Sequence, residues 1–408
     1  MFSVLRNRNF LILWSGQVLS QLADRMLVGV LLLNVHYLTN NNLALSLPML
    51  SFGLSAVIFG TIAGVYVDRW SKKKILVWSN ILRALLILSF PFFSVVSESL
   101  LLIFIVSFII FTIAQFFIPA ESSCIPTIIE KDKLLGANSF FMGTWMGATV
   151  FGFGLISFLS MLGININFIY IIASGFYLIA GILITFLKLH EVPVKRTHTI
   201  KSTVRDYILG FRYAIRKRLI KYSLFKVFIA TCVLAVLSEL AIDFVHRVLG
   251  QGSENFGFYV AFAGVGMGAS IVTLHYVHKI SKDILPWIGF TISGLMLVLM
   301  TLTTNFYLVL LFIFFLGFGN GYITIPIQTL LQEHVSVKMR GRVFGLQNVF
   351  ISAAFTIPVI LAGYLADQYS VKFVFAAMGL VTLISVFCLE LRLLMVPIER
   401  KYLSRGGQ

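Results

Sequence analysis

The sequence predicts an all-α membrane protein whose twelve transmembrane helices form two six-helix bundles, related to each other by a parallel pseudo-twofold repeat. Three observations support this fold class: 59% of the residues are hydrophobic, apolar runs recur along the whole chain, and one short phrase occurs twice. Only 12% of the residues are charged, whereas soluble globular domains contain about 25%. A single soluble core could not bury this much apolar surface.

Twelve apolar runs have the length of a membrane-spanning helix, which needs about 20 residues to cross about 30 Å of hydrocarbon. The runs are continuous and about twice as long as the alternating strands of a membrane barrel, so they favour helices. The predicted spans are residues 10–35, 45–67, 75–96, 100–124, 138–160, 166–187, 219–244, 255–278, 284–303, 305–328, 343–366 and 371–395.

The repeated phrase reads YVDRWSK at Tyr66–Lys72 and YVHKISK at Tyr276–Lys282. Each copy closes the second span of its own half. A weaker echo, IPAESS at Ile118–Ser123 and IPIQTL at Ile325–Leu330, ends the fourth and the tenth span. A unit of six spans is therefore repeated, and two such parallel repeats packed face to face place an interface between two bundles at the centre of the protein. We expect residues 1–187 and 219–408 to form the two bundles.

Residues 188–218 form the longest gap between predicted spans. Apolar residues recur there at helical spacing among basic ones, which is typical of an amphipathic helix lying on a membrane surface. A regulatory or partner-binding role is the alternative. The apolar residues are Val204, Tyr207, Ile208, Phe211, Ala214 and Ile215, and the basic ones are Arg205, Arg212, Arg216, Lys217 and Arg218.

Basic residues are distributed unevenly between the two sides of the predicted bundles. Of the 32 Lys and Arg residues, most lie at the termini and in the loops after even-numbered spans, whereas the opposite loops contain only Arg247 and Lys372. This positive-inside bias predicts that both termini are cytoplasmic. It also accounts for the net charge of +16, so no nucleic-acid partner is expected.

The segment GVYVDRWSKKK resembles the loop signature between the second and third spans of the major facilitator superfamily, through Gly64, Asp68, Arg69, Lys72, Lys73 and Lys74. Two further segments, FFIPAESSCIPTIIEKDKLLGANS and PIQTLLQEHVSVKMRGRVFGLQN, are similar to the branch that contains macrolide-type efflux pumps and the enterobactin exporter. The resemblance covers essentially the whole chain. It implies the fold of that superfamily and a secondary transporter that works by alternating access.

In that family the loop between the second and third spans is thought to latch the two bundles together in the outward-open state. Asp68 can face the N-terminal end of a neighbouring helix, and Arg69 with the following lysines holds the loop at the cytoplasmic side. A purely topogenic role is the alternative. The second copy has His278 in place of Asp68, and a histidine is mostly neutral at pH 7. We therefore expect the latch in the first half.

Charged side chains within the spans are candidates for function, because an ionisable group in hydrocarbon is costly unless it is paired or faces water. Asp24 lies about 21 Å from the inner face at 1.5 Å per residue. Arg25 points about 100° away from it around the helix. Arg83 is the cation nearest in depth in this half, so a buried Asp24–Arg83 link and a role in proton or substrate coupling are both open.

Span 7 carries Glu239, Asp243 and, just past its end, Arg247, four residues apart along one helix face. An exposed ion-pair cluster at the outer mouth is one interpretation. The other is a carboxylate pair that attracts a cationic substrate or takes up a proton. Glu121 closes span 4 near the cytoplasm. It is a charged candidate for function, and the alternative is an interface residue at a helix end.

Two departures weaken the resemblance to drug/proton antiporters. In FTIAQFF, the antiporter signature would place an arginine three residues before Gln115, where this chain has Thr112. Gln115 stays a coupling or substrate candidate. In span 5, Gly143 and Gly147 keep the small-xxx-small spacing that permits tight helix packing, but no proline follows Gly147.

The sequence contains no phosphate-binding loop and no His/Cys/Glu cluster at metal spacing, and Cys124, Cys232 and Cys388 are expected to be small packing residues. We therefore expect no enzyme, metal or cofactor. The resemblance and the apolar spans imply a monomeric transporter in the bacterial inner membrane, whose partners are the lipid bilayer, a small-molecule solute and protons. Proton-driven export of a drug-like compound or siderophore is the leading hypothesis. Uptake or facilitated diffusion of a metabolite, and a transport-inactive sensor, are the alternatives.

Overall fold

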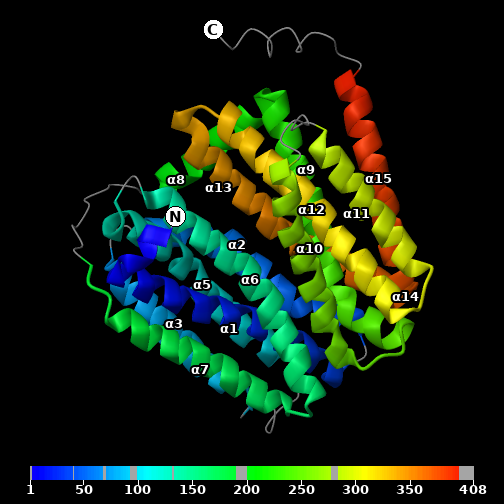
Figure 1. Ribbon diagram of the computed structural model, residues 1–408, viewed down its shortest axis with the longest axis horizontal. Coiled ribbons are helices and arrows are strands. Elements are labelled where there is room, and N and C mark those ends of the chain that lie inside the picture. Colours follow the sequence, from blue (N-terminus) through cyan, green and yellow to red (C-terminus); the bar gives the residue numbers. More distant parts are fainter. Residues whose placement is uncertain are drawn as a thin grey trace.

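The computed structural model describes residues 2–39, 41–67, 70–91, 99–130, 133–189, 200–276 and 284–394. The described residues fold into helices that lie side by side in two groups, with the first half of the chain in one group and the second half in the other (Figure 1). The helices of the first half are α1 (Arg8–Leu38), α2 (Asn42–Val67), α3 (Lys72–Leu88), α5 (Leu100–Ile128), α6 (Leu134–Met161) and α7 (Ile166–Thr185).

The second half begins with α8 (Ile200–Arg216), which precedes the spanning helices. These are α9 (Arg218–Asp243), α10 (Phe256–Tyr276), α11 (Leu285–Thr301), α12 (Phe306–His334), α13 (Val337–Ala354), α14 (Ile357–Gln368) and α15 (Val371–Leu394). A π-helix, η3 (Phe244–Val248), extends α9, and two short 3-10 helices are η1 (Phe2–Arg6) and η4 (Ser253–Asn255).

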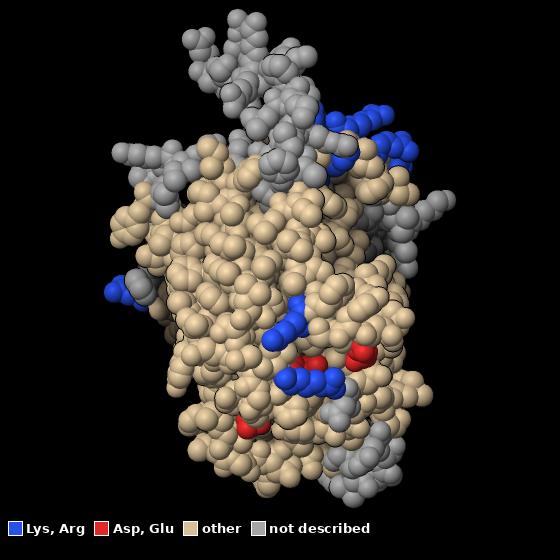
Figure 2. Space-filling view, turned by 90° about the vertical axis from the view of Figure 1, so that its right-hand side faces the viewer, with Lys and Arg blue, Asp and Glu red and all other residues tan. Residues whose placement is uncertain are grey.

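Within the described residues, nine helical segments are long and apolar enough to cross a membrane, and α13 with α14 provides one of them. Shorter apolar helices at Leu285–Thr301 and Val371–Ser385, together with α3, complete the set of predicted spans. The predicted all-α fold with twelve transmembrane helices is therefore confirmed. Most of the face in Figure 2 lacks charged side chains, as expected of a surface in contact with lipid.

The N-terminus is held by a cap and by a contact to α5. The Asn7 side chain accepts hydrogen bonds from the backbone N–H groups of Asn9 and Phe10, at 2.9 and 3.2 Å, and so satisfies the first donors of α1. Its Nδ2 donates to the carbonyl oxygen of Ile128, the last residue of α5, at 2.7 Å. We call the end of the molecule that carries Asn7 and α8 the linker end, and the opposite end the far end.

The internal repeat is visible in the helices. Pro119 lies inside α5 and Pro326 lies inside α12, at matching places in the two halves. The two copies of the repeated phrase begin in the last turns of α2 and α10. Asp68, Arg69 and His278 lie outside the described residues, so the latch stays a prediction.

The predicted amphipathic helix in the linker is present as α8. It packs closely against α13. A Cβ added to Gly210 would lie only 3.0 Å from the carbonyl oxygen of Arg342. Ala214 is buried, whereas Ile208 and Phe211 are exposed. The boundaries of the predicted bundles stay a prediction.

The two halves meet closely at the far end. There α2 packs on α13 and α14, and a Cβ on Gly53 would lie 2.4 Å from the Thr356 side chain. In the second contact, α6 packs on α10, and a Cβ on Gly257 would lie 2.2 Å from the carbonyl oxygen of Phe153. Only glycine permits such close approach of two helix backbones.

The prediction that Gly143 and Gly147 permit tight helix packing stays a prediction, since neither residue makes a close helix contact in the described part of the chain. Among the described residues, no atom lies within 4 Å of a Cβ placed on Gly143, and only Phe151 of the same helix lies 4.0 Å from one on Gly147. These glycines precede the part of α6 that contacts α10. The close contact uses Gly257 and Gly264 on the facing helix instead.

A glycine substitution tests the packing within the second half. A Cβ on Gly266 of α10 would lie 1.9 Å from the carbonyl oxygen of Phe314 in α12. We expect Gly266→Ala to lower the free energy of unfolding by about 1–3 kcal/mol, because the two backbones would have to separate. Thermal unfolding of the purified protein measures the loss.

The matched control is Gly175→Ala in α7, where the described residues leave space for the methyl group. This change should leave the unfolding temperature equal or higher, because alanine favours a helix more than glycine does. An equal loss in both variants would mean that the α10–α12 contact is looser than described.

Candidate functional site

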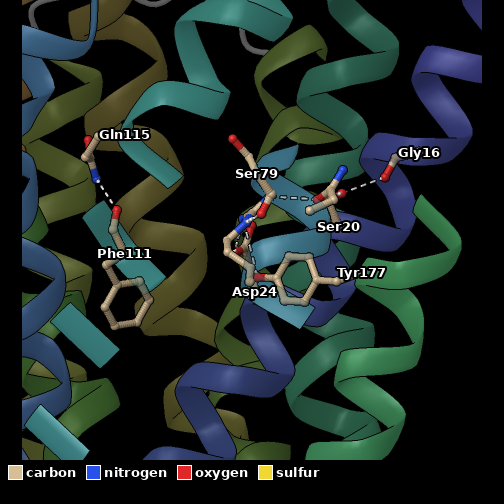
Figure 3. A network of polar contacts seen from close by, with 9 residues as sticks. Gly16, Ser20, Asp24, Ser79, Phe111, Gln115 and Tyr177 are labelled. Atoms are coloured by element: carbon tan, nitrogen blue, oxygen red, sulfur yellow. Dashed lines mark hydrogen bonds and ion pairs between the residues drawn. The ribbon is translucent and has the colours of Figure 1, made fainter. Parts of the chain in front are cut away.

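An ion pair joins two helices in the middle of the first half. Arg83 of α3 donates from Nη1 to Asp24 Oδ1 of α1 at 3.1 Å, so the predicted contact between these residues is present. The hydroxyl of Tyr177, on α7, donates to the same Asp24 oxygen. Figure 3 shows the Asp24 and Tyr177 side chains pointing toward one another between three helices.

Arg83 makes hydrogen bonds with each of its three nitrogens. Besides the Asp24 contact, Nη2 donates to Asn80 Oδ1 at 2.8 Å and Nε donates to the Ser79 carbonyl oxygen at 3.1 Å. The hydroxyl oxygen of Ser20 lies 2.9 Å from both Asn80 Oδ1 and the Gly16 carbonyl oxygen. These contacts fix the guanidinium plane and tie α1 to α3.

Aromatic rings cover the guanidinium as well. The Arg83 Cζ atom lies 4.4 Å from the ring centroid of Tyr177 and 4.9 Å from that of Phe117, distances at which a cation is attracted to an aromatic face. The Arg83 side chain is 0% exposed, whereas the Asp24 side chain is 25% exposed. The carboxylate is therefore the part of the pair that solvent or a solute can reach.

The Asp24 carboxylate can accept a proton while Arg83 keeps its other hydrogen bonds. In the ionised form it balances the Arg83 charge. In the protonated form the charge balance is lost, and Arg83 keeps its hydrogen bonds to Asn80, the Ser79 carbonyl and the Tyr177 hydroxyl, together with the aromatic rings. A change of protonation at Asp24 therefore changes the force between α1 and α3, which is the property that a coupling residue needs.

Arg25 faces a different helix from Asp24, as the helical spacing predicts. Its Cζ lies 5.2 Å from the ring centroid of Trp145 on α6. The aliphatic part of the Arg25 side chain packs against Gly152 of α6, where an added Cβ would lie 2.5 Å from Arg25 Cβ. Among the described residues its Nε has no hydrogen-bond partner. Arg25 thus belongs to the α1–α6 contact and not to the Asp24 pair.

Gln115 does not join the network. Its Nε2 donates to the Phe111 carbonyl oxygen of its own helix at 3.4 Å, and Figure 3 shows this pair apart from Asp24. Glu121 lies within α5, which continues to Ile128, and it is 7% exposed. Oε1 of Glu121 has no hydrogen-bond partner among the described residues. The expectation that Glu121 marks a helix end is therefore wrong.

The acidic residues of α9 are not an exposed cluster, so that interpretation is wrong for both of them. Glu239 is 0% exposed and Asp243 is 2% exposed. The i, i+4 contact expected for Asp243 and Arg247 is present, with Arg247 Nε 2.8 Å from Asp243 Oδ1. The helix changes to π geometry after Asp243, in η3, which carries Arg247. The other interpretation, that these two acids attract a cationic substrate or take up a proton, stays a prediction.

A pocket of about 90 Å³ lies between the two halves. Its walls come from α6 of the first half and from α9, α10 and α12 of the second. Trp145, the ring over which Arg25 lies, forms one wall, and Met146 and Met267 add flexible apolar surface. Thr149 and Ser238 are its polar groups. Such a lining suits an apolar or amphipathic group.

The lysines of the loop signature lie at the start of α3. Ser71 caps this helix by accepting from the Lys74 backbone N–H at 3.3 Å, and Lys72 is its first residue. Gly64 lies within α2. The contacts of Asp68 and Arg69 fall outside the described residues.

Sequence reasoning missed the neighbours of the Asp24–Arg83 pair, among them Asn80 and Tyr177. Asn80 lies one turn before Arg83 on α3, and this i, i+3 spacing of two polar residues was a usable signal. Tyr177 lies on α7, and no sequence pattern indicates that it faces Asp24. In the described part of the chain, no group of three or more His, Cys, Asp or Glu residues could hold a metal ion.

The sequence profile of the Major Facilitator Superfamily matches residues 13–290 and 285–407. The chain is 24% identical over 93% of its length to the uncharacterized MFS-type transporter YkuC of Bacillus subtilis, with 91% of that protein covered. It is 23% identical over 85% of its length to the putative bacilysin exporter BacE of Bacillus amyloliquefaciens, with 86% covered. It is 22% identical over 93% of its length to macrolide efflux protein A of Streptococcus pyogenes, with 95% covered.

Solved structures of transporters have the same fold. A mutant of the nucleoside transporter NupG superposes with a TM-score of 0.76 at 12% identity, covering 93% of this chain and 99% of the other. A bacterial homolog of the human lysosomal transporter Spinster superposes with a TM-score of 0.72 at 13% identity, covering 94% and 96%.

A double-mutant cycle tests the central ion pair. Asp24→Ala should lower the free energy of unfolding by about 3–5 kcal/mol, because Arg83 would be left buried without its counter-charge. Adding Arg83→Met should restore part of that loss, since the uncompensated charge is then gone. Thermal unfolding of the two single variants and the double variant measures the coupling. Purely additive losses would contradict a direct interaction.

Proposed function

Because the chain belongs to the major facilitator superfamily, we propose that it exports an amphipathic organic solute across the bacterial inner membrane in exchange for protons. The solute is a drug-like compound or a siderophore. The names of two relatives, a bacilysin exporter and a macrolide efflux protein, support export as the direction. The support for proton exchange comes from this chain's own residues and not from its relatives.

The observation that carries proton coupling is the environment of Asp24. Its carboxylate balances a fully buried arginine, yet a quarter of its side chain stays accessible. An ionisable group at this depth is costly to keep, and such groups mark proton relays and solute paths in membrane proteins. Asp24 releases its proton while the ion pair forms and takes one up when the pair separates.

The pocket between the halves supports an amphipathic solute. It lies where both bundles contribute walls, so a solute bound there contacts whichever bundle moves. Trp145 provides an aromatic surface, and Arg25 on its ring brings a cation close by. An apolar body with a polar or anionic group fits these neighbours better than a small hydrophilic metabolite does.

The contacts between the halves support alternating access as the mechanism. With both termini cytoplasmic, the far end is the outer end, and the close contacts of Gly53 and Gly257 shut it in this conformation. The solute then enters from the linker end, the cytoplasmic side. The protein works as a monomer, since both bundles of the path come from one chain.

Transport in inverted membrane vesicles tests the direction. When the vesicle interior is made acidic, vesicles that contain the protein should accumulate a radiolabelled macrolide above the level of vesicles without it, and a proton uncoupler should release it. The panel is extended to bacilysin and to a catecholate siderophore. Accumulation of these compounds only by right-side-out vesicles would mean uptake and would contradict export.

Asp24→Asn tests the coupling. Asparagine keeps an oxygen that accepts from Arg83 and Tyr177 but cannot ionise, so the fold should persist. We expect accumulation driven by the proton gradient to fall to the level of vesicles without the protein, while solute exchange without a gradient continues. Glu130→Gln, in an exposed ion pair with Lys133, is the matched control. Unchanged gradient-driven accumulation in Asp24→Asn would remove Asp24 from the coupling role.

A further inference from the structure

A carboxylate of the second half clamps a helix of the first half at the far end. Asp367 lies near the end of α14, and its two oxygens accept hydrogen bonds from the backbone N–H groups of Asn42 and Leu43, at 2.8 and 2.9 Å. These are the first residues of α2, whose N–H groups have no partner within the helix. The positive end of the helix dipole strengthens the contact. The Asp367 clamp therefore holds α2 against α14.

Glu239 lies beneath this clamp. It is 0% exposed, and neither of its carboxyl oxygens has a hydrogen-bond partner among the described residues. Helix α14 passes directly over Glu239 at Gly363. A Cβ added to Gly363 would lie 3.1 Å from Glu239 Oε1 and 2.8 Å from the Asn42 carbonyl oxygen. The closed far end thus seals a carboxyl group away from water without giving it a partner.

The charged neighbours of Glu239 do not compensate it. On its own helix and η3 these are Asp243, Arg247 and His246. Arg247 pairs with Asp243 at 2.8 Å, and His246 is exposed and packs on the His36 ring of α1 at 5.4 Å. From α14 the group that faces Glu239 is Asp367, a second carboxylate. An ionised Glu239 would therefore be buried beside a like charge, and closure of the far end favours its protonated form.

We propose that Glu239 is a second proton-binding site, and that its protonation from the outer side permits the Asp367 clamp to close. When the halves separate at the far end, Glu239 meets outer water and gives its proton to it. When it takes a proton back, the neutral acid can be covered by α14 and α2. The outer side is assigned by the proposed function, but the link between proton and closure does not depend on it.

The test measures opening of the far end directly, without a solute. Spin labels replace Leu162 at the end of α6 and Leu302 at the end of α11, which are exposed at 62% and 76%, after substitution of Cys124, Cys232 and Cys388 by serine. Pulsed electron resonance of the protein in lipid nanodiscs gives the ratio of closed to open molecules between pH 5 and 9. The ratio should rise as pH falls, by up to about tenfold per pH unit, the limit for one proton.

Glu239→Gln should stay closed across the whole pH range, since glutamine is always neutral. Asp367→Asn should open more at every pH yet keep the pH dependence, because Glu239 remains. Controls are Glu130→Gln and His246→Gln, both exposed, which should behave as the unmodified protein does. A pH dependence that survives in Glu239→Gln, or that is missing from the unmodified protein, would overturn the proposal. Neither outcome bears on solute export, which the vesicle assay tests separately.

Discussion

The need to compensate Arg83 in a medium without water determines how the first bundle is built. A guanidinium that is 0% exposed needs a counter-charge and a partner for each nitrogen. Asp24 supplies the charge, Asn80 and the Ser79 carbonyl supply acceptors, and Tyr177 closes the set. These groups come from α1, α3 and α7, so the packing of these three helices depends on the charge state of Asp24.

The interface between the halves follows a different rule. There the helices approach closely at Gly53 and Gly257. The Asp367 clamp uses backbone N–H groups that belong to the end of α2, so it can release without leaving a buried charge behind. A strong network inside a bundle and a reversible contact between bundles are what rigid-body alternating access requires.

The fold could be predicted from hydropathy and from the repeated phrase, because membrane spans must be continuous and apolar. Depth along a helix also matched Asp24 with Arg83. Depth does not tell which helices touch, so Tyr177 and Asp367 were missed, and Glu239 was not recognised as covered by α14. The spacing of Gly143 and Gly147 indicates that close packing is possible, but it does not say in which conformation a partner is present. These gaps in the prediction share one cause, since each depends on the contact between distant segments.

The proposed mechanism depends above all on the Asp24 carboxylate changing its protonation as the protein changes conformation. Infrared difference spectra of the protein in lipid, recorded as a transported solute is added, report the appearance and loss of protonated carboxyl groups. We expect the carboxylic-acid change on solute addition in the unmodified protein to contain a component from Asp24 that is absent from the difference spectrum of Asp24→Asn, while a component from Glu239 remains. An identical carboxylic-acid change in Asp24→Asn would assign the proton to another residue and contradict this mechanism.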